Sequence, residues 1–128
     1  MATRTSALGG GGPGDALRVQ TQRIGAACVV LAVEGELDVV AEPELATLVR
    51  SVTELPGVRA VALDLGRCTF CDVRGLAGIV TAAAAARRAG LDFGLLGVPA
   101  HVQRLADLAG LNGRFPREVA VSDLLAWG

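Results

Sequence analysis

Lysine and tyrosine are missing from this chain of 128 residues, and aromatic side chains make up only 3% of it. Without lysine there is no phosphate-loop lysine, no Schiff-base lysine and no kinase-type ATP-binding lysine. The scarcity of aromatic rings leaves few side chains that could stack on bases, sugars or flavins. The composition therefore argues against several common classes of nucleotide- and cofactor-dependent enzyme.

An excess of charge of either sign is missing as well. The 12 arginines are nearly balanced by 13 acidic residues, so the chain lacks the basic surplus that binds nucleic acid backbones. No charge-free apolar run reaches the roughly 18 residues that a membrane span needs. The first residues lack the apolar stretch of a secretory signal. We therefore expect a cytoplasmic protein with no nucleic acid partner and no membrane span.

Histidine and cysteine are scarce: His101 is the single histidine, and the cysteines are Cys28, Cys68 and Cys71. No serine or cysteine stands near His101 in the sequence, so we expect no catalytic role for it. An odd cysteine count suits a reducing compartment without a disulfide framework. Two thiols supply only half of a tetrahedral zinc site, and the other candidate ligands are scattered. We expect neither a metal nor a cofactor.

Small apolar residues are what the chain has in plenty. Hydrophobic residues make up 52% of it, so the core must be built mainly from Ala, Val and Leu. The length fits one domain. Residues 1–16 are rich in Gly and show no hydrophobic period, which predicts a disordered lead-in, and residues 17–128 are predicted to form the folded domain.

Apolar periodicity predicts strands that alternate with helices along that domain. The predicted strands are 17–24, 28–35, 58–65 and 91–98, and the predicted helices are 42–55, Asp72 to Arg88 and Pro99 to Gly110. The tail predicts a short extended piece and then a short helix with Ser122 as its N-cap. This order predicts an α/β fold: a mostly parallel sheet of four to five strands, an antiparallel edge strand and about four helices.

The segment CTFCDVRGLAG, residues 68–78, allows more than one interpretation. Its C-x-x-C spacing before a helix is typical of thioredoxin-like thiol sites, where the helix N-terminus lowers a thiol pKa. Free cysteine is also among the most buried residue types, and Cys68 and Cys71 stand at a strand end beside Phe70. A structural role in the core is the favoured hypothesis, and a redox site built on Cys68 and Cys71 is the alternative.

The residues that follow the second cysteine form a helix start. Asp72 can cap the unpaired backbone N–H groups of the first turn, beside the positive end of the helix. Gly75 would allow the helix to pack closely on the sheet. The same five residues could also present a binding surface, but taken alone they favour the structural role of capping and close packing.

Taken together with VEGELDVVAEPEL, the segment ALDLGRCTFCDVRGLAGI resembles the STAS domain, the family of bacterial anti-sigma factor antagonists. The resemblance covers about residues 17–126 and implies a single STAS-like domain. The step Gly35-Glu36-Leu37-Asp38 matches the first motif of that family. The residues that match the second motif are Asp64, Leu65, Phe70, Asp72, Gly75 and Leu76. Cys68 and Cys71 stand where the family has apolar side chains, which supports their structural role.

The resemblance implies a non-enzymatic module that docks an anti-sigma factor, typically a serine kinase of the histidine-kinase-like ATPase fold. In that family the kinase phosphorylates the first serine after the aspartate, which adds about −1.5 to −2 charges and ends the interaction. That position is Val73 in this chain, so the usual switch is expected to be absent. A scaffold subunit of a stress-signalling or transport-associated complex is the alternative that the family offers.

The expected docking surface lies at the start of the 72–80 helix, with the loop after the second strand beside it. Its aspartates would supply polar contacts and helix capping, Val73 and Leu76 apolar contact, and Arg74 charge complementarity. The partner-binding residues that we predict are Asp38, Asp72, Val73, Arg74, Gly75 and Leu76.

Overall fold

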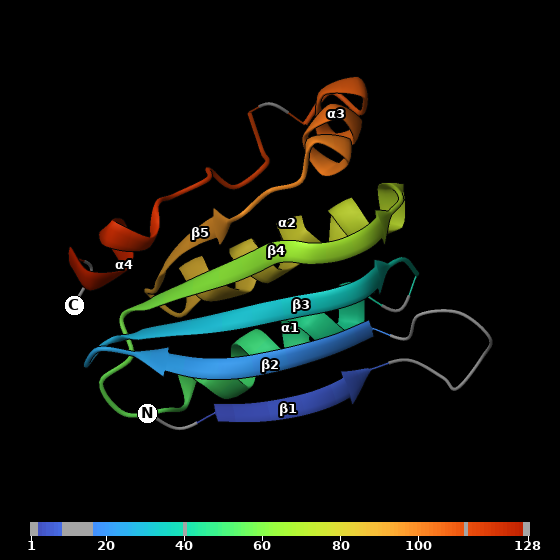
Figure 1. Ribbon diagram of the computed structural model, residues 1–128. Coiled ribbons are helices and arrows are strands. Elements are labelled where there is room, and N and C mark those ends of the chain that lie inside the picture. Colours follow the sequence, from blue (N-terminus) through green and yellow to red (C-terminus); the bar gives the residue numbers. More distant parts are fainter. Residues whose placement is uncertain (1–2, 9–16, 40, 112, 127–128) are drawn as a thin grey trace.

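A computed structural model describes residues 3–8, 17–39, 41–111 and 113–126. It has a five-stranded sheet in the order β1-β2-β3-β4-β5, with α1 and α2 packed on one face (Figure 1). The elements are β1 (Thr3–Leu8), β2 (Leu17–Ile24), β3 (Cys28–Leu37), α1 (Ala41–Thr53), β4 (Ala60–Cys71), α2 (Val73–Arg88), β5 (Asp92–Leu96), α3 (Ala100–Leu108) and α4 (Val121–Ala126).

The sheet is mixed. β3, β4 and β5 are parallel, and α1 and α2 are the crossovers between them. β2 joins β3 antiparallel, and β1 joins β2 antiparallel. The α/β class, the single sheet with an antiparallel edge and the four helices of the described residues confirm the predicted fold.

β1 is the main difference from the sequence prediction, which made residues 1–16 a disordered lead-in. Thr3–Leu8 instead pairs with β2 along its whole length, from Thr3 opposite Gln22 to Leu8 opposite Leu17. Two threonines give this short segment residues that favour strands, and the glycines begin only after it. The rest of the predicted lead-in, residues 1–2 and 9–16, lies outside the described residues.

The core lies between the sheet and the two crossover helices. It is built almost entirely from aliphatic side chains, as the composition predicted; among the described residues Phe93 is its one buried aromatic ring, and Phe115 packs against it. Its largest fully buried side chains include Leu31, Leu63, Leu45 and Ile79. Burying each such side chain contributes about 1.5–3 kcal/mol, so this layer fixes how α2 sits on the strands.

The opposite face of the sheet is only partly covered. At one end, Leu124 of α4 packs against Cys28, Val30, Ala62 and Leu96. The extended tail predicted before α4 is present as a parallel bridge between Leu95 and Glu118. Beyond α4 none of the described helices covers β2, β3 and β4 on this face, which is the one turned to the viewer in Figure 1.

Most boundaries differ from the predicted ones by one or two residues, and two differences matter for the site and the tail. β4 runs to Cys71, six residues beyond the predicted strand end, because its pairing with β3 continues to Leu37. α4 begins at Val121, and the backbone N–H of Ala120 donates to the Asp123 carboxylate at 2.9 Å. Ser122 is therefore not the N-cap. Within the described ranges, no helix has the length and apolar character needed to cross a bilayer.

Candidate functional site

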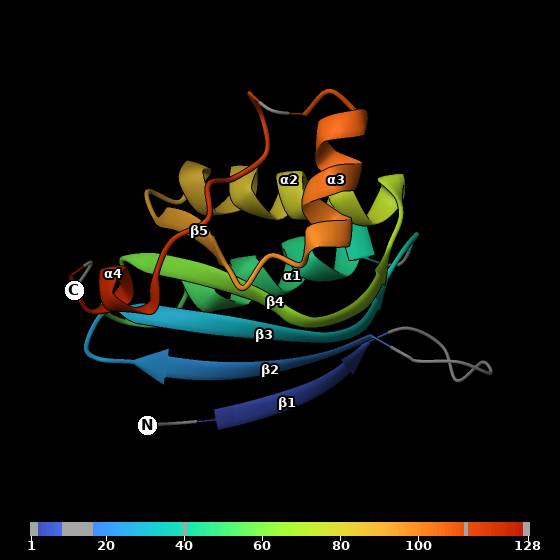
Figure 2. The same ribbon diagram turned by 45° about the horizontal axis from the view of Figure 1, so that its top comes forward.

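The two sequence motifs meet at the carboxyl end of the sheet. Leu37, the last residue of β3, pairs with Cys71, the last residue of β4. The backbone N–H of Asp72 donates to the carbonyl oxygen of Leu37 at 3.2 Å. Asp38 and Asp72 therefore leave two neighbouring strands at the same edge, where α2 begins (Figure 2).

Asp72 is the N-cap of α2. Its backbone is extended, with φ −110° and ψ −174°, and its Oδ1 accepts a hydrogen bond from the N–H of Gly75 at 2.9 Å. This satisfies one of the otherwise unpaired donors of the first turn. The capping role predicted for Asp72 is therefore confirmed. Asp38 is half-buried at the turn that follows β3.

Gly75 holds the first turn of α2 against the end of β3. A Cβ atom on Gly75 would overlap the backbone carbonyl of Leu37, and backbone cannot move aside as a flexible side chain can. Gly75 is also buried. Its place in the site is therefore to allow close packing, as predicted, and it offers no side chain to a partner.

Leu76 does not have the role that the sequence predicted. Its side chain is fully buried, with 0% of its surface exposed, and it belongs to the core beneath α2. The apolar periodicity of α2 explains this burial, because Leu76 and Ile79 lie on the same side of the helix. Leu76 positions the helix start and cannot contact a partner in this conformation.

Other apolar side chains are exposed at this edge. Five large hydrophobic side chains are exposed among the described residues, and three of them lie within two residues of the Leu37–Cys71 pair: Val39 at 55%, Phe70 at 48% and Val73 at 59%. Arg74, in the next position, is exposed too. We call Val39, Phe70, Val73 and Arg74 the sheet-end patch. Apolar groups gathered on a surface mark interaction sites more often than scattered ones do.

A β-bulge explains why Phe70 faces outward. Gly35 pairs with Cys68 and the next residue of β3, Glu36, pairs with Phe70, so Thr69 is an extra residue in β4. A bulge breaks the strict alternation of faces. Both cysteines therefore point inward while Phe70 is exposed. The sequence prediction missed Phe70 as a surface residue because regular alternation gives no sign of the bulge, and it did not single out Val39, which lies in the turn after β3.

The thiols of the C-x-x-C segment are part of the core. Cys68 is 4% exposed and Cys71 is 8% exposed. Burial, together with the neighbouring Cys68 and Asp72, raises the pKa of Cys71 to about 12. Burial also raises the pKa of Cys68 above that of an ordinary thiol. A reactive thiol needs a lowered pKa, so these properties favour the structural role over the redox alternative.

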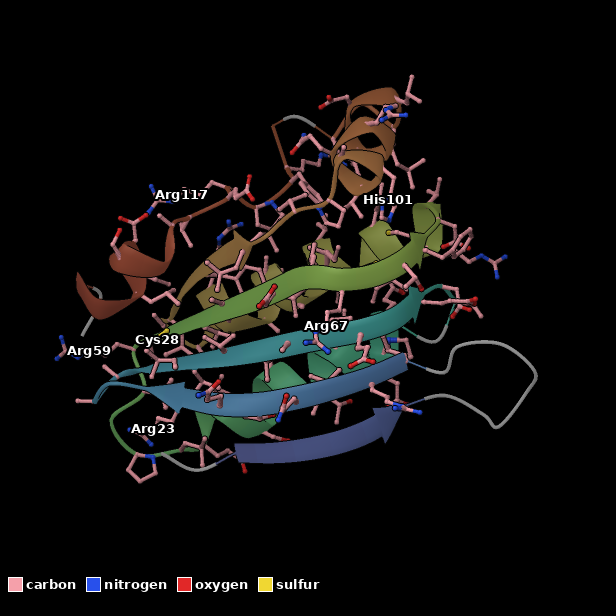
Figure 3. The ribbon with its side chains drawn as sticks, in the orientation of Figure 1. Arg23, Cys28, Arg59, Arg67, His101 and Arg117 are labelled. Atoms are coloured by element: carbon pink, nitrogen blue, oxygen red, sulfur yellow. The ribbon has the colours of Figure 1, made fainter. Side chains whose placement is uncertain are left out.

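The structure also describes His101 and two threonines whose side chains carry polar groups. Among the described residues, no three His, Cys, Asp or Glu side chains come together as a ligand set for a metal ion. His101 is exposed in the first turn of α3 (Figure 3). Thr81 donates to the Glu42 carboxylate at 3.3 Å and so ties α2 to α1. Thr69 is an exposed hydroxyl next to the patch.

Comparison with known proteins places this arrangement in a family. The family model described as "Mlab, STAS domain" matches residues 20–125. The anti-sigma factor antagonist SpoIIAA in its unphosphorylated form is similar in structure, with a TM-score of 0.63 and 17% identity, over 82% of this chain and 90% of that one. An anti-sigma factor antagonist from Mycobacterium paratuberculosis is also similar, with a TM-score of 0.65 and 24% identity, over 86% and 92%.

A form of RsbS from Moorella thermoacetica in which a serine is replaced by glutamate has the same fold, with a TM-score of 0.65 and 20% identity, over 84% of this chain and 92% of that one. No curated protein matches this chain. The family model nevertheless spans most of the ordered strands and helices. This chain belongs to the STAS domain family.

Proposed function

We propose that this chain is a non-enzymatic STAS module that binds a protein partner through the sheet-end patch, as an anti-sigma factor antagonist does. One observation carries the proposal: of the five large hydrophobic side chains that are exposed in the described part of the chain, three lie at the edge where α2 begins. Val73 stands on a helix start that is fixed by the Asp72 cap and by the packing of Gly75, and Val39 and Phe70 lie at the ends of the two strands beside it. A rigid apolar patch with one cation beside it suits protein contact.

The partner that we propose is an anti-sigma factor, of the kind with a serine-kinase-type ATPase fold. The similarity of the fold to anti-sigma factor antagonists supports this choice. SpoIIAA also has a solved phosphorylated form, so that relative takes phosphate. A cytoplasmic location goes with the proposal, because sigma factors and their antagonists act there.

We further propose that binding is constitutive. Val73 stands at the family's serine position and has no hydroxyl, so a kinase cannot add phosphate to it. The Val73 side chain is 59% exposed, so it offers apolar contact surface at the position where phosphate would end partner binding in a relative with the serine. The docking role of Asp38 and Asp72 is then mainly to hold the loop and the helix start in place.

A second candidate function is that of a scaffold in a transport-associated complex. A murine anion transporter, Slc26a9, is similar with a TM-score of 0.63 and 14% identity, and the match covers 98% of this chain but 22% of the transporter. A sulfate transporter family protein from Wolinella succinogenes is similar too, with a TM-score of 0.61. In that case the partner would be a membrane protein rather than an anti-sigma factor.

Site-specific photo-crosslinking separates the two functions. A photoreactive phenylalanine derivative replaces Val73 in cells, and the same residue replaces Leu108, which is 81% exposed on α3, as the control. Mass spectrometry identifies what is captured. We expect an anti-sigma factor of the ATPase fold from the Val73 position only. Capture of a membrane transporter would favour the scaffold function, and identical products from both positions would refute the docking surface.

A further inference from the structure

A concave site lies on the open face of the sheet, away from α1 and α2. It is a hollow of about 540 Å³ whose polar lining comes from three neighbouring strands: Arg18, Gln20, Glu34, Asp64 and Arg67. Figure 3 shows Arg67 over the middle of this face. The hollow is separate from the sheet-end patch, and nothing in the proposed docking function uses it.

Strand register arranges the lining in two rows. Arg18 is opposite Glu34, and Glu34 is opposite Arg67, which makes one row of alternating charge across β2, β3 and β4. Gln20, Ala32 and Asp64 make the next row in the same way. Ala32 at the centre of this second row has a single methyl group, so only a small side chain stands between the amide of Gln20 and the carboxylate of Asp64.

A β-bulge turns Arg67 into the hollow. Ala32 pairs with Asp64 and Glu34 pairs with Arg67, so three steps along β4 match two steps along β3. Leu65 is buried in the core, and regular alternation would send Arg67 to that same side. Asp64 Oδ1 accepts the N–H of Gly66 at 2.9 Å and so helps to hold the bulge. Bulges of this kind re-aim side chains beside functional sites.

The charges in the hollow select a class of ligand. Nη1 of Arg67 lies 3.9 Å from Oε2 of Glu34. The Arg67 side chain is 81% exposed and that of Glu34 is 51% exposed, so a ligand can still reach both charges. Two arginines and two acids cancel, so a polyanion would meet the carboxylates of Glu34 and Asp64 as well as the guanidinium groups. A molecule that carries one positive and one negative group matches both.

We propose that this hollow is a binding site for a small zwitterion with one ammonium and one carboxylate group. The Asp64 carboxylate accepts a hydrogen bond from the ammonium group of the ligand, and an arginine of the first row donates hydrogen bonds to the carboxylate of the ligand. Alternate residues along a strand are about 7 Å apart, so the two ligand charges are separated by roughly 5–7 Å. A dipeptide has this separation.

Glycylglycine is the probe, followed by amide chemical shifts of the full chain in a ¹H–¹⁵N NMR titration. We expect saturable shifts at Arg18, Ala32, Glu34 and Gly66. Glycinamide keeps only the ammonium group and N-acetylglycine keeps only the carboxylate, so each is expected to bind about tenfold more weakly. Shifts that do not saturate, that lie elsewhere, or that are equal for the three compounds would overturn the proposal.

Two substitutions test the individual charges. Arg67→Gln and Asp64→Asn are each expected to weaken glycylglycine about tenfold, because each removes one charged partner. Asn keeps the oxygen that accepts from Gly66, so the bulge is retained. Arg88→Gln, at the far end of α2, is the matched control and is expected to bind as the unaltered chain does. Unchanged affinity in both hollow variants would refute the site.

Discussion

Arg74 is the residue that gives the sheet-end patch its charge. It is exposed in the first turn of α2, and that turn contains no acidic residue. The helix N-terminus is itself positive, so the arginine and the helix end add to each other. A partner that docks here is expected to present a carboxylate beside an apolar pocket, because like charges brought together at an interface are costly.

Replacing Arg74 with an acid separates binding from stability. Arg74→Glu is expected to weaken partner binding by more than about a hundredfold, because the new carboxylate would face the carboxylate that we expect on the partner. The free energy of unfolding should rise by roughly 0.3–1 kcal/mol, because an acid suits the helix N-terminus. Calorimetric titration measures the affinity for the partner, and urea denaturation measures the free energy of unfolding.

Arg88→Glu is the control: it makes the same charge change at the other end of α2 and should leave binding intact. Unchanged binding of Arg74→Glu would remove Arg74 from the interface.

Gly75 matters for stability because it lets the first turn of α2 pack closely against the end of β3. Gly75→Ala places a methyl group against the carbonyl of Leu37 and is expected to cost at least about 2 kcal/mol of unfolding free energy. Gly113→Ala is the matched control, because a Cβ there meets nothing within 4 Å. It should change stability by less than about 0.5 kcal/mol. Equal stability of the two variants would show that the helix start is not packed as described.

At the scale of elements, the end of β4 is where the sequence prediction was weakest. Two register shifts lie between β3 and β4, one beside Asp64 and one at Thr69. Each turns a side chain that regular alternation would bury, Arg67 and Phe70, toward solvent. Bulges leave no mark in a hydrophobic pattern, because they depend on how two strands pair. The helix start after them was predicted correctly, since the Asp72 cap and the periodicity of α2 are local signals.

Buried thiols at the two ends of the paired strands β3 and β4 make stability depend on pH. The pKa of Cys71 is raised to about 12 and that of Cys28 to about 11, in both cases by burial, from a value of 9.0. The unfolded chain therefore loses its thiol protons first. Stability is expected to hold below about pH 9 and to fall as the pH rises toward 11 to 12.

Urea midpoints between pH 7 and 10.5 test this dependence. Cys71→Ala removes the most strongly shifted thiol and should flatten the fall above pH 9, at the cost of a small cavity that lowers stability equally at every pH. An identical slope in the unaltered chain and in Cys71→Ala would contradict the burial of this thiol. Rapid alkylation of Cys71 in the folded protein would restore the redox alternative.

At the scale of the whole molecule, the fold could be predicted because its signals are repeated and local. Alternating strands and helices, the GELD step and the Asp72 helix start all pointed to one architecture. β1 was not predicted, because a six-residue segment with few apolar side chains becomes a strand through its pairing with β2. The hollow on the open face was missed for a similar reason: its two rows join residues of three strands that only the sheet brings together.

In our proposal, binding is constitutive because Val73 has no hydroxyl, and the substitution Val73→Ser introduces that hydroxyl. Val73→Ser is expected to bind the partner as the unaltered chain does, and to take about one phosphate per chain from a kinase partner with ATP. Phosphate adds about −1.5 to −2 charges at the start of α2, where the apolar contact is made, and should release the partner. Mass spectrometry and a binding titration before and after ATP measure both effects.

Val39→Ser is the matched control for this gain of regulation. It introduces the same hydroxyl at a side chain of similar exposure in the sheet-end patch, 55% against 59%, but away from the helix start. It should take no phosphate. Phosphate on Thr69 of the unaltered chain would contradict constitutive binding. The hydroxyl of Thr69, near the end of β4, would then serve as the switch. If neither the unaltered chain nor Val73→Ser is modified while both bind, the partner is not a kinase, and the domain acts by docking alone.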